Sequence, residues 1–124
     1  MTPTILFTVA GLIAALWFFY HLIAGRKEVV IPMRKTPAID PIVRDTLHLV
    51  WHFVTASLAF LASLFLLAAV KSSNDFAMAG TILAWGFTIV GTTLVLNLGG
   101  RFRDLPQGLL FLPIALLGTA GLVL

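Results

Sequence analysis

Long apolar segments separated by short polar ones dominate the sequence. Four such segments occur, and each is close to the length, about 17 to 25 residues, with which a helix crosses the hydrocarbon core of a bilayer. The pattern predicts an all-α integral membrane protein: one antiparallel bundle of four transmembrane helices in a single domain, residues 1–124. The expected helices cover about residues 4–24, 46–70, 76–98 and 107–124.

The first connection, residues 25–45, is the long one. Pro32, Pro37 and Pro41 lie within it. Each proline removes a backbone donor and clashes with the preceding turn of a helix. The sequence therefore predicts a loop here and not a continuous helix.

The other two connections are short. Residues 71–75, "KSSND", predict a tight turn that makes the second and third helices a hairpin. In the loop 99–106, Gly99 and Gly100 can end the third helix because glycine accepts the left-handed conformation of a helix C-terminus.

Composition agrees with lipid as the solvent. The chain is 60% hydrophobic and only 10% charged, whereas a soluble domain averages about 25% charged residues. So few polar groups cannot cover a globular surface. The chain has no cysteine, which excludes disulfide scaffolds, thiol catalysis and cysteine metal sites.

The basic residues gather in the two loops 25–45 and 99–106. Together these loops carry seven lysines and arginines, and the opposite side has only Lys71. Such a bias places both loops in the cytoplasm, so both termini are expected outside, in the inner membrane of a bacterium. Basic clusters of this kind set orientation, and we expect no nucleic-acid partner. The seven are Arg26, Lys27, Arg34, Lys35, Arg44, Arg101 and Arg103.

Small and polar residues follow one another at helical spacing on two of the expected helices. Small residues at such steps let helix backbones approach closely in a membrane, so these faces are expected to turn inward and the apolar ones toward lipid. On the third helix the face holds Gly80, Ala84, Thr88, Gly91 and Thr92. On the second it holds Asp45, His48, His52, Thr55, Ala59 and Ser63, with Leu49, Phe53, Phe60 and Leu64 expected elsewhere.

All three histidines fall at one expected depth. His21 ends the first helix, and His48 and His52 begin the second, so they are expected near the cytoplasmic boundary of the membrane. One interpretation is structural: the histidines bond to polar neighbours such as Asp45, while tryptophans including Trp51 form an interfacial belt.

A second interpretation is a metal or haem site. His48 and His52 have the i, i+4 spacing that lets two imidazoles reach one ion, and His21 and Asp45 could complete the ligand set. A haem b would instead need one histidine on each side, such as His21 opposite His48 or His52. The sequence does not favour either cofactor over none.

A third interpretation is ligand handling in the cytoplasmic leaflet. A histidine layer could bind a quinone or a lipid or relay protons. Basic and aromatic side chains at the same boundary, Arg101, Arg103, Arg44 and Trp51, are candidate contacts for an acidic lipid headgroup.

Motifs of small four-helix membrane families were compared with the chain. Asn97, Gly100 and Phe102 are similar to part of the asparagine–glycine helix motif of fluoride channels, but they lie on a different helix. The glutamate of the first helix of small multidrug transporters has no counterpart here. The sequence is assigned to no family.

The expected function is that of a small polytopic membrane protein without enzymatic activity. Almost no soluble mass lies outside the four apolar segments. We expect an accessory subunit that packs against a larger membrane protein or against itself. The alternative is a protein that binds a metal, haem b, quinone or lipid through His21, His48 and His52.

Overall fold

The computed structural model describes residues 2–124, and every regular element in this range is a helix. Six helical segments follow one another: α1 (Pro3–Tyr20), η1 (His21–Val30), α2 (Ile31–Lys35), α3 (Pro41–Lys71), α4 (Asn74–Asn97) and α5 (Gln107–Val123). The all-helical class predicted from the sequence is confirmed.

Three helices are long and apolar enough to cross a membrane. They are the continuous helix Pro3–Lys35, which joins α1, η1 and α2, then α3, and then α4. Helix α5 is apolar but shorter, with 17 residues. These lengths and compositions are compatible with a helical bundle in a membrane.

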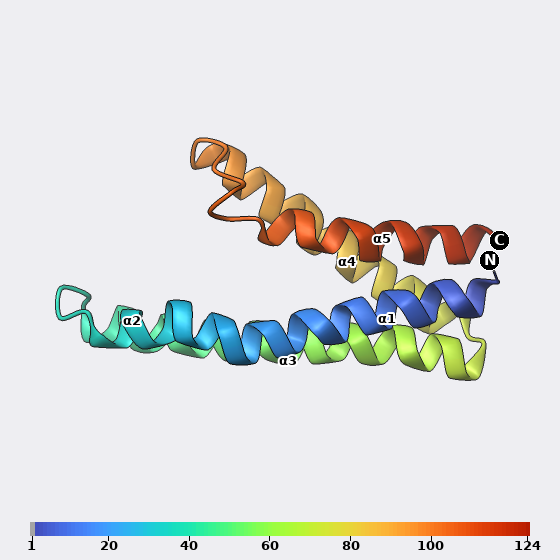
Figure 1. Ribbon diagram of the computed structural model, residues 1–124, viewed down its shortest axis with the longest axis horizontal. Helices are drawn as coiled ribbons and strands as arrows, with labels where there is room; N and C mark the ends of the chain where they lie inside the picture. The colour runs from blue at the N-terminus through green and yellow to red at the C-terminus, as the bar shows by residue number, and fades with distance from the viewer. Residues whose placement is uncertain (1) are drawn as a thin grey trace.

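The helices form two hairpins that touch at one end and diverge at the other (Figure 1). The continuous first helix lies along α3, and α4 lies along α5. Helix α1 also contacts α5, and α3 contacts α4. Both chain ends lie at the end where the hairpins meet. The connection between α2 and α3 lies far from them, at the tip of the long hairpin.

The core fills only the end where the two hairpins meet. In α1 the buried residues run from Leu6 to Ala14, and in α3 from Leu58 to Ala69. Phe65 and Ile114 are among the largest fully buried side chains there. The first 17 residues of α3, before Leu58, include no buried residue. That half of α3 therefore lies beside the first helix without a closed core around it.

Glycines allow the closest helix contacts in this core. A Cβ on Gly91 would lie 2.6 Å from the Cα of Gly108, so the backbones of α4 and α5 cross almost in contact. Gly118 of α5 lies against the ring of Phe65. The predicted small-residue face of α4 is confirmed as a packing face, because Gly80, Ala84 and Thr88 are all buried.

The long loop predicted for residues 25–45 is wrong. The first helix continues to Lys35, and only residues 36–40 leave helical structure before α3 begins at Pro41. Asp40 caps α3 by accepting the backbone N–H of Ile42 at 2.9 Å. Proline fits at Pro41 because the first helical position needs no N–H partner. The predicted loop is therefore a helical hairpin with a short tip.

The register of η1 explains why Pro32 does not end the helix. In an α-helix a proline ring clashes with the carbonyl four residues earlier. The segment His21–Val30 is a π-helix, and at its end the Ile31 N–H donates to the carbonyl of Arg26, five residues back. The wider π-helical turn uses bonds to the fifth residue back. It therefore does not need the bond to the fourth residue back that Pro32 cannot make.

The polar face predicted to turn inward along α3 is not confirmed, because none of its six residues is buried. In the packed half, Ser63 is exposed and its hydroxyl donates to the carbonyl of Ala59, 2.8 Å away. Leu64, predicted to meet lipid, is buried. Burial in this half follows the apolar residues around Leu61 and Phe65, because they face α1 and α4.

The two short connections agree with their prediction. Ser72 ends α3 in the left-handed conformation, with φ at 48°, and the N–H of Ser73 returns to the carbonyl of Ala68 at 3.1 Å. Gly99 and Gly100, with φ at 97° and 71°, end α4. The N–H of Gly100 bonds to the carbonyl of Val95 at 2.8 Å, which closes the last turn.

Candidate functional site

The three histidines lie in the unpacked half of the long hairpin. His21 is the first residue of η1, and His48 and His52 lie one turn apart on α3, the helix that runs beside it. The three histidines can approach one another only if the first helix lies along α3, and the structure has this arrangement. Their side chains nevertheless divide into two groups.

His21 belongs with Trp51. The imidazole stacks on the indole with ring centres 3.8 Å apart and an angle of 14° between the planes. The Nε2 atom of His21 lies 3.3 Å from the backbone carbonyl oxygen of Trp51 and can donate to it. The tip of the indole lies over Gly25, where a Cβ would come within 2.9 Å of the ring. Glycine thus makes the space in which the tryptophan docks.

His48 and His52 form the second group, together with Arg34. Their Nε2 atoms are 3.2 Å apart, and Nδ1 of His48 lies 3.4 Å from a guanidinium nitrogen of Arg34. Arginine has no acceptor, so the Nδ1 of His48 must accept. His48 then carries its proton on Nε2 and donates to Nε2 of His52, whose own proton is on Nδ1. These contacts assign a different tautomer to each of the two imidazoles.

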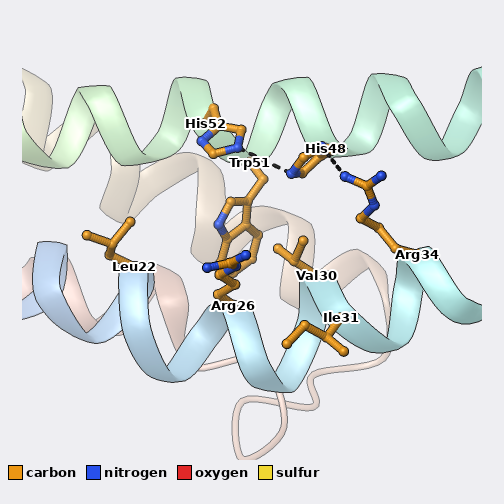
Figure 2. Close-up of a pocket in the computed structure, with 8 residues that line it drawn as sticks. All are labelled: Leu22, Arg26, Val30, Ile31, Arg34, His48, Trp51 and His52. Carbon is orange, nitrogen blue, oxygen red and sulfur yellow. Dashed lines mark hydrogen bonds between the residues drawn. The ribbon is translucent and has the colours of Figure 1, made fainter.

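A groove of about 460 Å³ runs between η1–α2 and α3 beside this pair (Figure 2). One wall carries two guanidinium groups and the other carries the histidines and the indole, with aliphatic side chains between them. No acidic residue lines it. The lining residues are Leu22, Arg26, Val30, Ile31, Arg34, His48, Trp51 and His52.

Arg26 and Arg34 were absent from the candidate site residues predicted from the sequence. They were assigned to a loop because of the prolines, and a loop gives no face on which to align them. The helical pattern was nevertheless present: Leu22, Arg26, Val30 and Arg34 recur at steps of four. Once the segment is helical, this spacing places all four on the side that faces α3.

The structure brings together only part of the predicted metal-ligand set of His48, His52, His21 and Asp45. His48 and His52 are adjacent, but His21 is directed to the Trp51 carbonyl, and Asp45 is exposed and bonds to no histidine. Among residues 2–124, no three histidine, cysteine or acidic side chains are grouped to hold one ion. The guanidinium of Arg34 beside His48 also opposes a cation there.

A haem between His21 and the pair on α3 does not fit this arrangement. A haem iron would bind His21 through Nε2, and that atom lies 3.3 Å from the carbonyl oxygen of Trp51. Ligation would require the imidazole to turn away from this carbonyl.

The predicted lipid and anion contacts are spread over both hairpins. Trp51 lines the groove. Arg101 pairs with Asp104 inside the α4–α5 connection, its Nε donating at 2.9 Å, and Arg103 is exposed in the same connection. Arg44 is partly buried near the start of α3 and does not line the groove.

Comparisons with protein families, with curated proteins and with solved structures find no match to this chain.

Proposed function

We propose that this chain is a small membrane protein without enzymatic activity, which acts by packing against a larger membrane protein as an accessory subunit. In this proposal it lies in a bacterial inner membrane with both termini outside. The distribution of charge supports the orientation: seven of the eight lysines and arginines lie toward the ends of the hairpins away from the termini, and Lys71 lies at the other end.

The observation that carries the proposal is an apolar stripe on α3. It extends beyond the part of the helix that packs against α4. At steps of three or four residues it contains Leu58, Val54, Val50, Leu47 and Val43. Leu58 is 3% exposed, whereas Val50, Leu47 and Val43 are 47%, 46% and 51% exposed. The stripe that packs in the core continues along the helix after α4 has diverged from it.

Lipid chains do not account for the whole of this exposure. Helix α3 has 31 residues, a length of about 46 Å at 1.5 Å per residue, against a hydrocarbon core of about 30 Å. With Lys71 at the outer boundary, residues 41–50 extend beyond the hydrocarbon. Aliphatic side chains that recur on one face at that level favour a protein surface as their partner.

The hydroxyl groups of α3 support a non-enzymatic role. Every serine and threonine of this helix donates to the carbonyl four residues earlier at 2.8 to 3.0 Å, so each is committed to its own backbone. None of these hydroxyls is hydrogen-bonded to a histidine that could activate it as a nucleophile. The four serines and threonines of α3 are Thr46, Thr55, Ser57 and Ser63.

Photo-crosslinking in the native membrane tests the proposal. A benzophenone amino acid is placed at Val50, on the unpartnered stripe, and in a second variant at Phe60, which is 59% exposed on the packed half of the same helix. We expect an adduct with one larger chain from position 50 and none from position 60.

Equal adducts from both positions, or none from position 50, would contradict the proposal. An adduct with twice the 13.4 kDa mass of the chain would show that the partner is a second copy of this chain and not a larger protein.

A further inference from the structure

The groove beside the histidine pair carries positive charge that the fold does not neutralise. Arg26 and Arg34 line it, and the only salt bridge within residues 2–124 joins Arg101 to Asp104 elsewhere. Both side chains are exposed toward the groove and its surroundings. Guanidinium groups present a planar fork of donors that matches the oxygens of carboxylate and phosphate.

The histidine pair adds a donor to the groove. His48 accepts from Arg34 through Nδ1, and its contact with His52 leaves the Nδ1–H of His52 as a donor with no partner in the described structure. Figure 2 shows Arg34, His48 and His52 joined by hydrogen bonds along one side of the groove. An anion would meet donors from both helices.

The groove continues onto an apolar surface. A second hollow of about 430 Å³ is lined by Leu22, Ile23, Arg26, Lys27 and Ile31, so it shares three side chains with the first. Leu22 and Ile23 lie next to the apolar part of the first helix in the sequence. The two hollows together fit a ligand with an anionic head and an apolar chain.

The depth of the groove matches the headgroup layer. In the membrane placement proposed above, the 20 residues from Thr4 to Ile23 cover about 30 Å of hydrocarbon at 1.5 Å per residue. Arg26, three residues further, then lies about 5 Å beyond the hydrocarbon, at the level of the lipid phosphates, and Arg34 lies about 12 Å further along the helix. Basic pockets between helices on the cytoplasmic side are a recurrent form of acidic-lipid site.

We propose that this groove binds the phosphate headgroup of an anionic phospholipid between Arg26, Arg34 and the His48–His52 pair, with an acyl chain along Leu22 and Ile23. The inference rests on the membrane placement proposed above but not on a protein partner. A soluble phosphate shares the headgroup chemistry but makes no use of the apolar extension.

Native mass spectrometry of the detergent-purified full chain tests this site. Dioleoylphosphatidylglycerol, dioleoylphosphatidylcholine and inorganic phosphate are the three probes. We expect the wild type to prefer phosphatidylglycerol to phosphatidylcholine. In Arg26→Gln/Arg34→Gln, phosphatidylglycerol should bind about 30-fold more weakly, from about fivefold for each basic side chain at a membrane surface. Glutamine at position 34 retains an N–H for His48, so the neighbouring contact is preserved.

Arg101→Gln/Arg103→Gln is the matched control, because it removes the same charge from the other hairpin. It should retain the wild-type preference. Equal loss in both double variants, or equal binding of the two lipids by the wild type, would overturn the site. Inorganic phosphate that displaces phosphatidylglycerol would overturn the lipid as its occupant. Circular dichroism melting of both variants distinguishes loss of binding from loss of fold. Failure here with a partner adduct retained at position 50 would leave the subunit proposal intact.

Discussion

Trp51 determines how the unpacked half of the long hairpin is held together. Its indole stacks on His21 and lies over Gly25, so three residues from two helices meet in one contact. A tryptophan at this depth was expected from the general preference of aromatic residues for the membrane interface. The structure adds a specific reason: the ring fills a space that only glycine leaves open.

The tautomers of His48 and His52 provide a prediction at the level of single atoms. Because Arg34 can only donate, His48 should be protonated on Nε2 and His52 on Nδ1. Nitrogen-15 NMR of histidine-labelled protein in lipid, at about pH 8 where free imidazole is neutral, reports both tautomers. The same tautomer on both residues would contradict the hydrogen-bonded chain.

A second prediction concerns Gly118, which lies against the ring of Phe65. A Cβ here would come 2.8 Å from that ring and closer still to Oγ1 of Thr81, and Phe65 is 0% exposed. Gly118→Ala should lower the free energy of unfolding by about 1 to 3 kcal/mol, as overpacking does. Denaturant unfolding in detergent measures it.

Gly86→Ala is the control for Gly118→Ala, because no atom lies within 4 Å of its added Cβ. It should be neutral or gain up to about 1 kcal/mol from helix propensity. If the two variants change stability equally, the contact between Gly118 and Phe65 does not hold these helices together.

Among the elements, the continuous first helix is the largest difference from the prediction. The sequence rule that prolines end helices is sound for an α-helix, but η1 bonds five residues back before Pro32 and so escapes it. The apolar segments located the ends of the other helices to within five residues, because these helices are long and strongly apolar. The end of a π-helical segment has no comparable pattern in the sequence.

Amide hydrogen exchange tests the extent of this helix. We expect amides of residues 25–35 to exchange slowly, because they are bonded within η1 and α2, and those of residues 36–40 to exchange fast. The tip of the hairpin serves as the internal control. Equally fast exchange over the whole range 25–40 would restore the loop predicted from the sequence.

The candidate site was predictable in part. The histidines, Trp51 and their common depth followed from helix positions, since helices that run side by side bring equal depths together. The pairing of His21 with Trp51 and of His48 with His52 depends on side-chain rotation. Arg26 joins the groove only because the segment around it is helical. Such relations arise from tertiary packing, and a single sequence does not specify them.

At the scale of the whole molecule, the charge distribution predicts orientation. The protein has no cysteine of its own, so a single introduced cysteine reports one position. Ala38→Cys and Arg103→Cys, in the two basic connections, should react with an impermeant maleimide only after cells are opened. Ser73→Cys, in the α3–α4 turn, should react in intact cells. The reverse pattern would place the groove outside the cell and contradict the proposed topology.

The most direct test of the account is to purify the protein in mild detergent from its native membrane. One sample then yields the visible absorption spectrum, the elemental content and the identity of co-purifying chains. If the protein is a subunit, a second membrane protein should co-purify with it in a fixed ratio. The sample should show neither a haem band nor stoichiometric metal. A solitary chain with a haem band or bound metal that is lost in His48→Ala and His52→Ala would contradict the account and make this a cofactor protein.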